Sequence, residues 1–105
     1  MPPKPVELHP RATDEAADAY EWYTARNPHA AEAFMAEVDR AIERIAEAPA
    51  RWPVHLHGTR RFLLRRFPFA LIYRENPDTI LVLAVAHGRR RPGYWRRRGP
   101  RDPRL

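Results

Sequence analysis

A chain of 105 residues is long enough for one domain with a single modest core and too short for two. It has no cysteine, which excludes disulfides and thiolate metal sites, and it has no apolar run near the roughly 18 residues of a membrane span. The N-terminal stretch MPPKPVEL lacks the apolar centre of a signal peptide, so we expect a cytoplasmic protein that does not enter a membrane.

The charges are segregated along the chain. Residues 1–50 carry five basic and ten acidic side chains, a net charge of −5, whereas residues 51–105 carry fourteen arginines against three acidic residues, a net charge of +11. This asymmetry predicts a polyanionic partner, either nucleic acid or an acidic protein segment. Arginine outnumbers lysine eighteen to one over the whole chain, and so general a preference weakens any argument from arginine counts alone.

The chain is expected to begin with a short strand and a helix. Prolines on both sides restrict Val6–Leu8 to the edge of a sheet, and the residues before it are expected to fray. Apolar residues then recur at helical spacing, which predicts a helix from Pro10 or Thr13 to about Arg26. The acidic residues of this helix and of the next one are interpreted as a solvated face.

Asn27-Pro28 is the clearest boundary in the chain. Asparagine is a good helix N-cap, and proline suits the first helical position. The helix that follows is expected to end before Pro49, because the residue before a proline avoids the helical region. With so short a joint, the two helices are expected to pack as an antiparallel hairpin. Tyr23 and Phe34 are expected to serve core and helix–helix packing rather than an exposed aromatic patch. The apolar stripe of the second helix contains Ala31, Phe34, Val38, Ala41, Ile42 and Ile45.

Three strands are predicted after this hairpin, at Arg61–Arg66, Phe69–Glu75 and Ile80–His87. Phe67-Pro68 separates the first two strands, and Asn76-Pro77-Asp78 forms a turn between the second and the third. Residues 80–86 are apolar at every position. This pattern predicts a central strand that is covered on both faces.

These elements predict an α+β fold in the order β-α-α-β-β-β. The N-terminal helical hairpin is expected to pack on one face of a small, mostly antiparallel sheet. Residues 1–98 are expected to form this single domain, and residues 99–105 a disordered tail. The other face of the sheet and the segment after His87 would then form one exposed, arginine-rich surface.

Two blocks carry a resemblance to a known family: RRFLLRRFPFALIY at residues 60–73 and ILVLAVAHGRRRPGYWRRR at residues 80–98. Over residues 5–98 the chain resembles the RelE/ParE superfamily of toxins from type II toxin–antitoxin systems, and most closely its ParE-like, plasmid-stabilisation branch. The resemblance implies a toxin that arrests bacterial growth. It also implies a cognate antitoxin as partner, whose acidic, disordered C-terminal segment wraps the toxin in a hetero-oligomer.

The resemblance implies two alternative targets. ParE-like members inhibit DNA gyrase by binding it, without chemistry of their own. RelE-like members are ribosome-dependent endoribonucleases that cut mRNA without a metal ion. The RelE-like pattern supplies a lysine on the sheet, whereas the only lysine here is Lys4, so we favour the gyrase inhibitor over the enzyme. A non-toxic, basic nucleic-acid-binding module is the third alternative.

For RNA cleavage the chain offers His87, Tyr94, Arg65 and Arg89 as candidate catalytic residues. Attack by a 2′-hydroxyl needs a base, an acid and cations that stabilise the phosphorane. Imidazole is the side chain best suited to acid–base chemistry near neutral pH, so His87 could serve as base or acid, and Tyr94 could donate a proton. The arginines could bind phosphate, but a guanidinium stays charged and cannot act as the base.

A second set of residues is expected to bind the target protein. We favour a position for Tyr94 and Trp95 that is folded back over the end of the sheet, rather than stacked on a base, and a purely solvated arginine face stays open as the alternative. His55 and His57 lack a third ligand at suitable spacing, so we expect no metal and no other cofactor. The candidate target-binding residues are Arg61, Arg90, Arg91, Trp95, Arg96 and Arg97.

Overall fold

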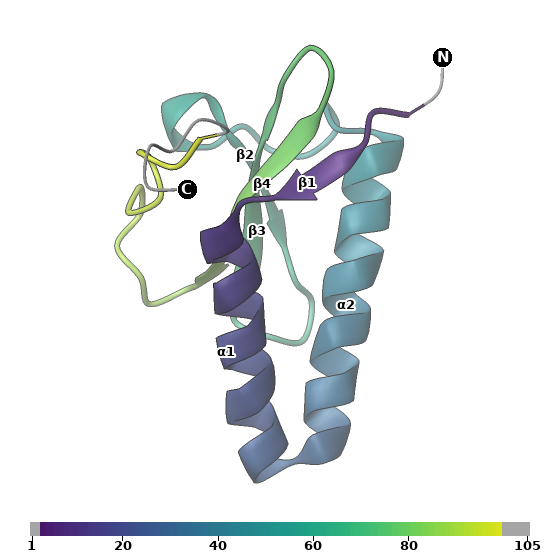
Figure 1. Cartoon of the computed structure of the whole chain (residues 1–105), viewed down its shortest axis with the longest axis vertical. Helices are drawn as coiled ribbons and strands as arrows, with labels where there is room; N and C mark the ends of the chain where they lie inside the picture. Colours follow the sequence, from purple (N-terminus) through teal and green to yellow (C-terminus); the bar gives the residue numbers. More distant parts are fainter. Residues whose placement is uncertain (1–2, 100–105) are drawn as a thin grey trace.

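Two helices and four strands follow one another in the predicted order β-α-α-β-β-β in the computed structural model, which describes residues 3–99 (Figure 1). The predicted α+β fold is therefore confirmed, with the helices on one face of the sheet. The predicted tail lies outside the described residues except for Gly99. The elements are β1 (Val6–Leu8), α1 (Pro10–Arg26), α2 (Pro28–Glu47), β2 (Arg60–Leu63), β3 (Phe69–Glu75) and β4 (Ile80–His87), with a short 3-10 turn at Leu56–Gly58.

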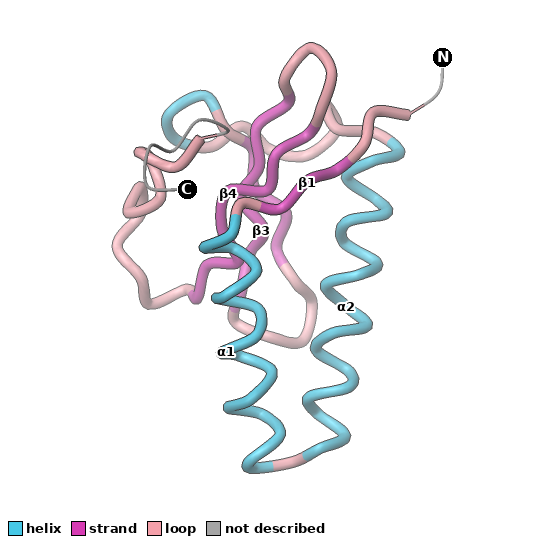
Figure 2. The backbone as a smooth tube through the Cα atoms, in the orientation of Figure 1, coloured by secondary structure: helices cyan, strands magenta, loops and turns pink. Residues whose placement is uncertain are grey.

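The helical hairpin is defined by the residues that cap its helices. The imidazole Nδ1 of His9 accepts a hydrogen bond from the backbone N–H of Arg11 at 3.0 Å, so α1 begins at Pro10 rather than at Thr13. Asn27 ends α1 and caps α2: its N–H donates to Tyr23, and its side-chain oxygen accepts from the N–H of His29. Figure 2 shows the resulting short connection at the far end of the hairpin.

The sheet has the strand order β1-β4-β3-β2, with β1 parallel to β4 and the other pairs antiparallel. β4 is thus a central strand and β1 an edge strand, both as predicted. β2 is shorter than expected, because it spans Arg60–Leu63 instead of Arg61–Arg66. The N–H of Leu64 still donates to the carbonyl of Phe69 in the neighbouring strand. The N–H groups of Arg65 and Arg66 instead donate to the Glu37 carboxylate, so the strand does not continue through them.

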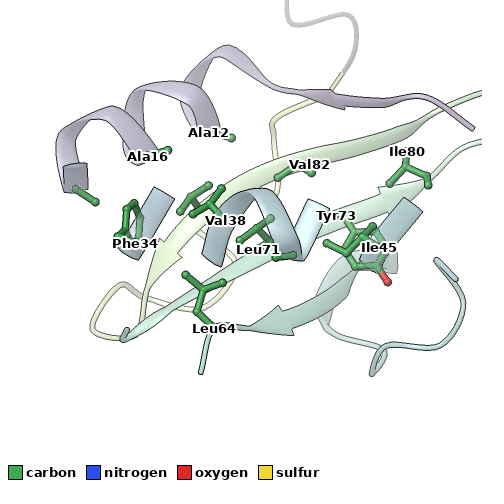
Figure 3. Packing of buried hydrophobic residues seen from close by; sticks show 13 residues of the cluster. Ala12, Ala16, Phe34, Val38, Ile45, Leu64, Leu71, Tyr73, Ile80 and Val82 are labelled. Atoms are coloured by element: carbon green, nitrogen blue, oxygen red, sulfur yellow. The ribbon is translucent and has the colours of Figure 1, made fainter. Parts of the chain in front are cut away.

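The main hydrophobic core lies between the sheet and the hairpin (Figure 3). Phe34 is fully buried there and its ring contacts Tyr23 at a centroid distance of 5.5 Å, so the prediction that both rings serve core and helix–helix packing is confirmed. Side chains of β4 divide between this core and a second, smaller cluster on the outer face, so the prediction that β4 is covered on both sides is also confirmed. Trp95 is the largest side chain of the outer cluster, and only 1% of its surface is exposed.

Two expectations about polar residues are wrong. Lys4 was expected in a frayed end, but its Nζ lies 2.8 Å from a carboxylate oxygen of Glu75 and 2.9 Å from the carbonyl oxygen of Asn76. Glu37 was assigned to a solvated face, yet it is buried beneath the β2–β3 loop. Burial alone would raise the pKa of Glu37, but the two N–H donors and the guanidinium of Arg66 outweigh this effect and lower it.

Candidate functional site

The segment after β4 is held by tight turns and side chains rather than by strand pairing. The N–H of Gly88 donates to the carbonyl of Pro68 and that of Arg90 to the carbonyl of His87, whereas Tyr94, Arg96 and Arg98 donate to carbonyls three residues back within the segment. Gly93 has a positive φ of 85°, and a Cβ atom there would lie 3.1 Å from the His57 ring. In Figure 1 this segment leaves the sheet on the side of α1. We call residues 88–98 the C-terminal segment.

Glu15 of α1 connects this segment to the rest of the fold. Its carboxylate accepts hydrogen bonds from the Tyr94 hydroxyl at 2.7 Å and from both terminal nitrogens of Arg98 at 2.9 and 3.1 Å. It also accepts from the backbone N–H of Val85 in β4 at 3.1 Å. Glu15 was interpreted as part of a solvated face, and this interpretation is wrong because a buried arginine and a tyrosine cover its carboxylate.

Tyr94 is committed to this network. Burial, followed by the hydrogen bond to Glu15 and the negative charge of that residue, raises the pKa of the Tyr94 hydroxyl far above its ordinary value. The Arg90 guanidinium lies 3.9 Å from the ring centroid on the exposed side, and that of Arg98 lies 5.0 Å from it. A hydroxyl held in this way is a donor to Glu15 and a weak acid at neutral pH.

The other candidate catalytic residues do not all meet Tyr94. His87 ends β4, packs edge-on against Phe69 at 5.0 Å and accepts the N–H of Arg89 at its Nδ1 atom. His87, Tyr94 and Arg89 line one groove. Arg65 lies in the loop after β2, where it lines neither of the two grooves described next.

Two grooves flank the C-terminal segment. The helix-side groove, of about 480 Å³, lies between α1 and the end of β4, and includes Trp22, which is 52% exposed. The sheet-side groove, of about 330 Å³, lies over the outer face of β2, β3 and β4, with Ile72 and Trp95 in its lining. Both grooves share His87, Arg90 and Tyr94, together with Pro68 and Phe69. These five residues therefore form a wall between two largely apolar depressions.

Four arginines around these grooves have no carboxylate partner among the described residues. Arg61, Arg90 and Arg91 line the sheet-side groove, and Arg89 lines the helix-side groove. Within residues 3–99 the ion pairs are Lys4–Glu75, Arg66–Glu37 and Arg98–Glu15, so no carboxylate neutralises these four groove arginines. Burial, the Arg61 charge and the nearby His57 lower the pKa of His55 in the sheet-side groove. The groove is therefore electropositive.

The predicted target-binding residues do not form one continuous surface. Arg61, Arg90 and Arg91 lie together at the sheet-side groove, whereas Arg96 and Arg97 are exposed but line neither groove. Trp95 is buried on the sheet, so the ring is not available to a partner in this conformation and the folded-back position is the correct one.

The expected single surface of arginines is likewise only partly correct. Arg66 and Arg98 turn toward carboxylates of the two helices. Arg60 and Arg74 donate to backbone carbonyls, those of Trp52 and His57.

Sequence reasoning missed Glu15, Glu37 and Arg98. A signal for the two glutamates was present in the helical spacing. Glu37 lies three residues after Phe34 and four before Ala41, within the buried stripe of α2. Glu15 likewise lies between the buried Ala12 and Ala19 of α1. A carboxylate inside an apolar stripe indicates a buried partner.

The described residues support neither a metal site nor a membrane-spanning helix. Across residues 3–99, no three histidine or acidic side chains lie close enough together to hold a metal ion. His55 and His57 instead contact the Trp95 ring, at centroid distances of 5.8 and 5.9 Å. Neither helix of the described part combines the length and the apolar character needed to cross a membrane.

Comparisons with known proteins agree on one family. Residues 6–92 match the family described as ParE toxin of type II toxin-antitoxin system, parDE. The chain is 27% identical over 88 residues to Toxin ParE2 from two strains of Mycobacterium tuberculosis, CDC 1551 / Oshkosh and H37Rv, covering 83% of this chain and 84% of the relative.

A solved structure also shares the fold. A chain of the chromosomal ParDE toxin–antitoxin system from P. aeruginosa superposes with a TM-score of 0.73 at 16% identity, covering 83% of this chain and 98% of that one. The match to the family extends over both blocks that carried the resemblance, apart from the last residues of the second block. The chain therefore belongs to the ParE toxin family of type II toxin–antitoxin systems.

Proposed function

We propose that this toxin arrests growth by binding DNA gyrase through the arginines of its two grooves, without cutting nucleic acid. The observation that carries the proposal is the set of four unpaired groove arginines, Arg61, Arg89, Arg90 and Arg91, beside apolar depressions. Arginine and aromatic side chains are enriched where proteins bind one another, and an unpaired cation can form an ion pair with an incoming carboxylate. Membership in the ParE family supports the same target class.

Binding is favoured over RNA cleavage by the state of the candidate catalytic groups. The Tyr94 hydroxyl donates a hydrogen bond to Glu15, and its raised pKa makes it a poor general acid. The arginines remain protonated and cannot serve as a base. His87 is thus the one candidate left for acid–base chemistry, and one group cannot supply both proton transfers at once.

The partner that neutralises the toxin is proposed to be a cognate antitoxin with an acidic, unstructured segment. Carboxylates on that segment would pair with the groove arginines, and its apolar residues would fill the depressions between them. Antitoxin and gyrase would then compete for the same cations in the cytoplasm. A hetero-oligomer of toxin and antitoxin is the expected resting state.

The proposal is tested by gyrase supercoiling assays with purified toxin. The test variant carries Arg61→Ala, Arg90→Ala and Arg91→Ala. The matched control carries Arg11→Ala, Arg40→Ala and Arg44→Ala, which removes the same charge from exposed positions on the helices. We expect at least a tenfold higher inhibitory concentration for the test variant and less than a twofold change for the control.

Three results would contradict the proposal. Normal supercoiling at saturating wild-type toxin excludes gyrase as the target. mRNA cut at codon positions in induced cells, with loss of cutting in His87→Ala, would establish the ribosome-dependent nuclease instead. Continued growth on induction, together with DNA affinity that falls steeply with salt, would indicate a non-toxic nucleic-acid-binding module.

A further inference from the structure

The position of the C-terminal segment depends on three side chains. After Gly88 the N–H groups of Arg89 and Arg90 still donate to His87 at the end of β4, but the later backbone hydrogen bonds stay within the segment and do not fix residues 91–98 relative to the sheet. Trp95 anchors one side of the segment in the outer cluster. Tyr94 and Arg98 anchor the other side, and both do so at the carboxylate of Glu15.

Glu15 and Arg98 also complete the edge of β4. β1 pairs with β4 only as far as Val82, which leaves the next edge groups of β4 without a strand. The N–H of Val85 donates to Glu15, and the carbonyl of Leu83 accepts from Arg98 at 3.0 Å. Since buried backbone groups need partners, these two side chains replace the missing strand pairing.

The energetics of this arrangement favour one position of the segment. The side chains of Glu15 and Arg98 are only 16% and 7% exposed, so separating the two charges would leave each largely buried without its counter-ion. The Tyr94 ring held by Glu15 in turn supports the Arg90 guanidinium, which lies over its exposed side. Glu15 therefore determines where the wall between the two grooves stands.

We infer that Glu15 is a positioning residue, which holds Tyr94 and Arg98 so that Arg89, Arg90 and Arg91 face a partner protein together. The inference rests on the proposed function only for the identity of that partner; the positioning of the segment by Glu15 does not depend on it. Loss of the carboxylate would leave the fold in place but free the C-terminal segment. The arginines would then lose the shared geometry on which tight binding depends.

The test uses Glu15→Gln, which keeps the size of the side chain but places an amide donor where donors converge. Asp14→Asn is the matched control, because Asp14 is the exposed neighbour in α1 and forms no hydrogen bond or ion pair with a described residue. Tyr94→Phe and Arg98→Lys, which each weaken one part of the network, serve as second variants in case Glu15→Gln does not fold. Hydrogen exchange, gyrase inhibition and growth arrest on induction are measured for each protein.

We expect Glu15→Gln to speed amide exchange at least tenfold in residues 88–98 while α2 and β3 keep wild-type rates. Its inhibitory concentration should rise at least tenfold and its growth arrest should weaken, with Tyr94→Phe intermediate and Asp14→Asn unchanged. A merely structural role would instead speed exchange throughout the chain.

The inference and the proposed function fail in different ways. Wild-type exchange in residues 88–98 of the Glu15→Gln protein would overturn the inference whatever the target is. Freed exchange with undiminished growth arrest would overturn it as well. Weakened growth arrest in a toxin that never affects gyrase would support the positioning role and refute the gyrase proposal.

Discussion

The two faces of the sheet are covered in different ways. On the inner face the two long helices bury a continuous apolar core around Phe34, Leu71 and Tyr73. On the outer face a segment without regular secondary structure covers only part of the sheet, mainly through Trp95. Apolar grooves and unpaired arginines remain beside that segment. The inner face thus supplies most of the stability, whereas the outer face and its rim supply the surface for partners.

The polar contacts follow the same division. Glu37 fixes the β2–β3 loop against α2, which is a contact within the framework. Glu15 connects the framework to the C-terminal segment and lies at the border between the two regions. Substitutions on the inner face should therefore change the free energy of unfolding, and substitutions of the groove arginines should change binding.

The largest effect on stability is expected from Phe34→Ala. The ring is fully buried and packs against Tyr23, Phe67 and Phe69. Truncation of a buried phenylalanine typically costs about 3–5 kcal/mol, because apolar contacts are lost and a cavity remains. Urea denaturation measures this loss. Leu63→Ala, at a position that is 61% exposed, is the control and should cost under about 0.5 kcal/mol.

The next largest loss in the free energy of unfolding is expected at high pH. Tyr73 lies in the inner core and donates its hydroxyl hydrogen to the carbonyl of Pro49. Burial, offset in part by Arg60 and reinforced by Glu75, raises the pKa of Tyr73 from 10.0 to about 12. The hydroxyl of Tyr73 therefore ionises at a lower pH in the unfolded chain than in the folded protein. Its contribution to the free energy of unfolding is complete below pH 10 and is lost as the pH rises toward 12.

The loss attributable to Tyr73 amounts to about 2–3 kcal/mol, since each pKa unit corresponds to about 1.4 kcal/mol. Urea denaturation at pH 9 and pH 12 measures it. In Tyr73→Phe the decline should be smaller but not absent, because the pKa of Tyr94 is raised as well. An equal decline in both proteins would mean that Tyr73 does not contribute.

A smaller loss is expected from Glu37→Gln. The carboxylate accepts from the N–H groups of Arg65 and Arg66, and its replacement by an amide should cost about 1–3 kcal/mol at pH 7. The pKa of Glu37 is lowered in the folded state, so the carboxylate stabilises the fold above the ordinary value of 4.5 and loses this effect as the pH falls below it. Urea denaturation at pH 7 and pH 3 should show the two proteins converging at acidic pH, and a constant difference would contradict the assignment.

Local patterns in the sequence predicted most of the framework. Helical spacing, the Asn27 cap and the prolines gave the hairpin, and the apolar run at residues 80–86 gave the central strand. The exact end of β2 was missed, because it depends on Glu37, a residue that is distant in the sequence. Local chemistry thus predicts where elements begin, whereas tertiary contacts decide where some of them end.

The candidate site was less predictable than the fold. Its location after β4 followed from the sequence, and so did the folded-back position of Trp95. The division of the arginines into paired and unpaired ones did not, because Arg98 meets Glu15 across 83 positions of sequence. Such a pairing depends on how an irregular segment returns to the sheet, and neither periodicity nor capping residues encode that path.

The smallest change in stability is expected from Arg91→Ala, although it lies only seven positions before Arg98. Arg91 is exposed at the sheet-side groove and has no carboxylate partner, so its removal should change the free energy of unfolding by less than about 0.5 kcal/mol. Arg98→Ala should instead cost about 1–3 kcal/mol, because it leaves the largely buried carboxylate of Glu15 without its counter-ion and the carbonyl of Leu83 without its donor. Urea denaturation of both variants side by side makes the comparison. A loss above about 1 kcal/mol in Arg91→Ala would mean that the groove arginines stabilise the fold, and the distinction between a stabilising inner face and a binding surface would no longer hold.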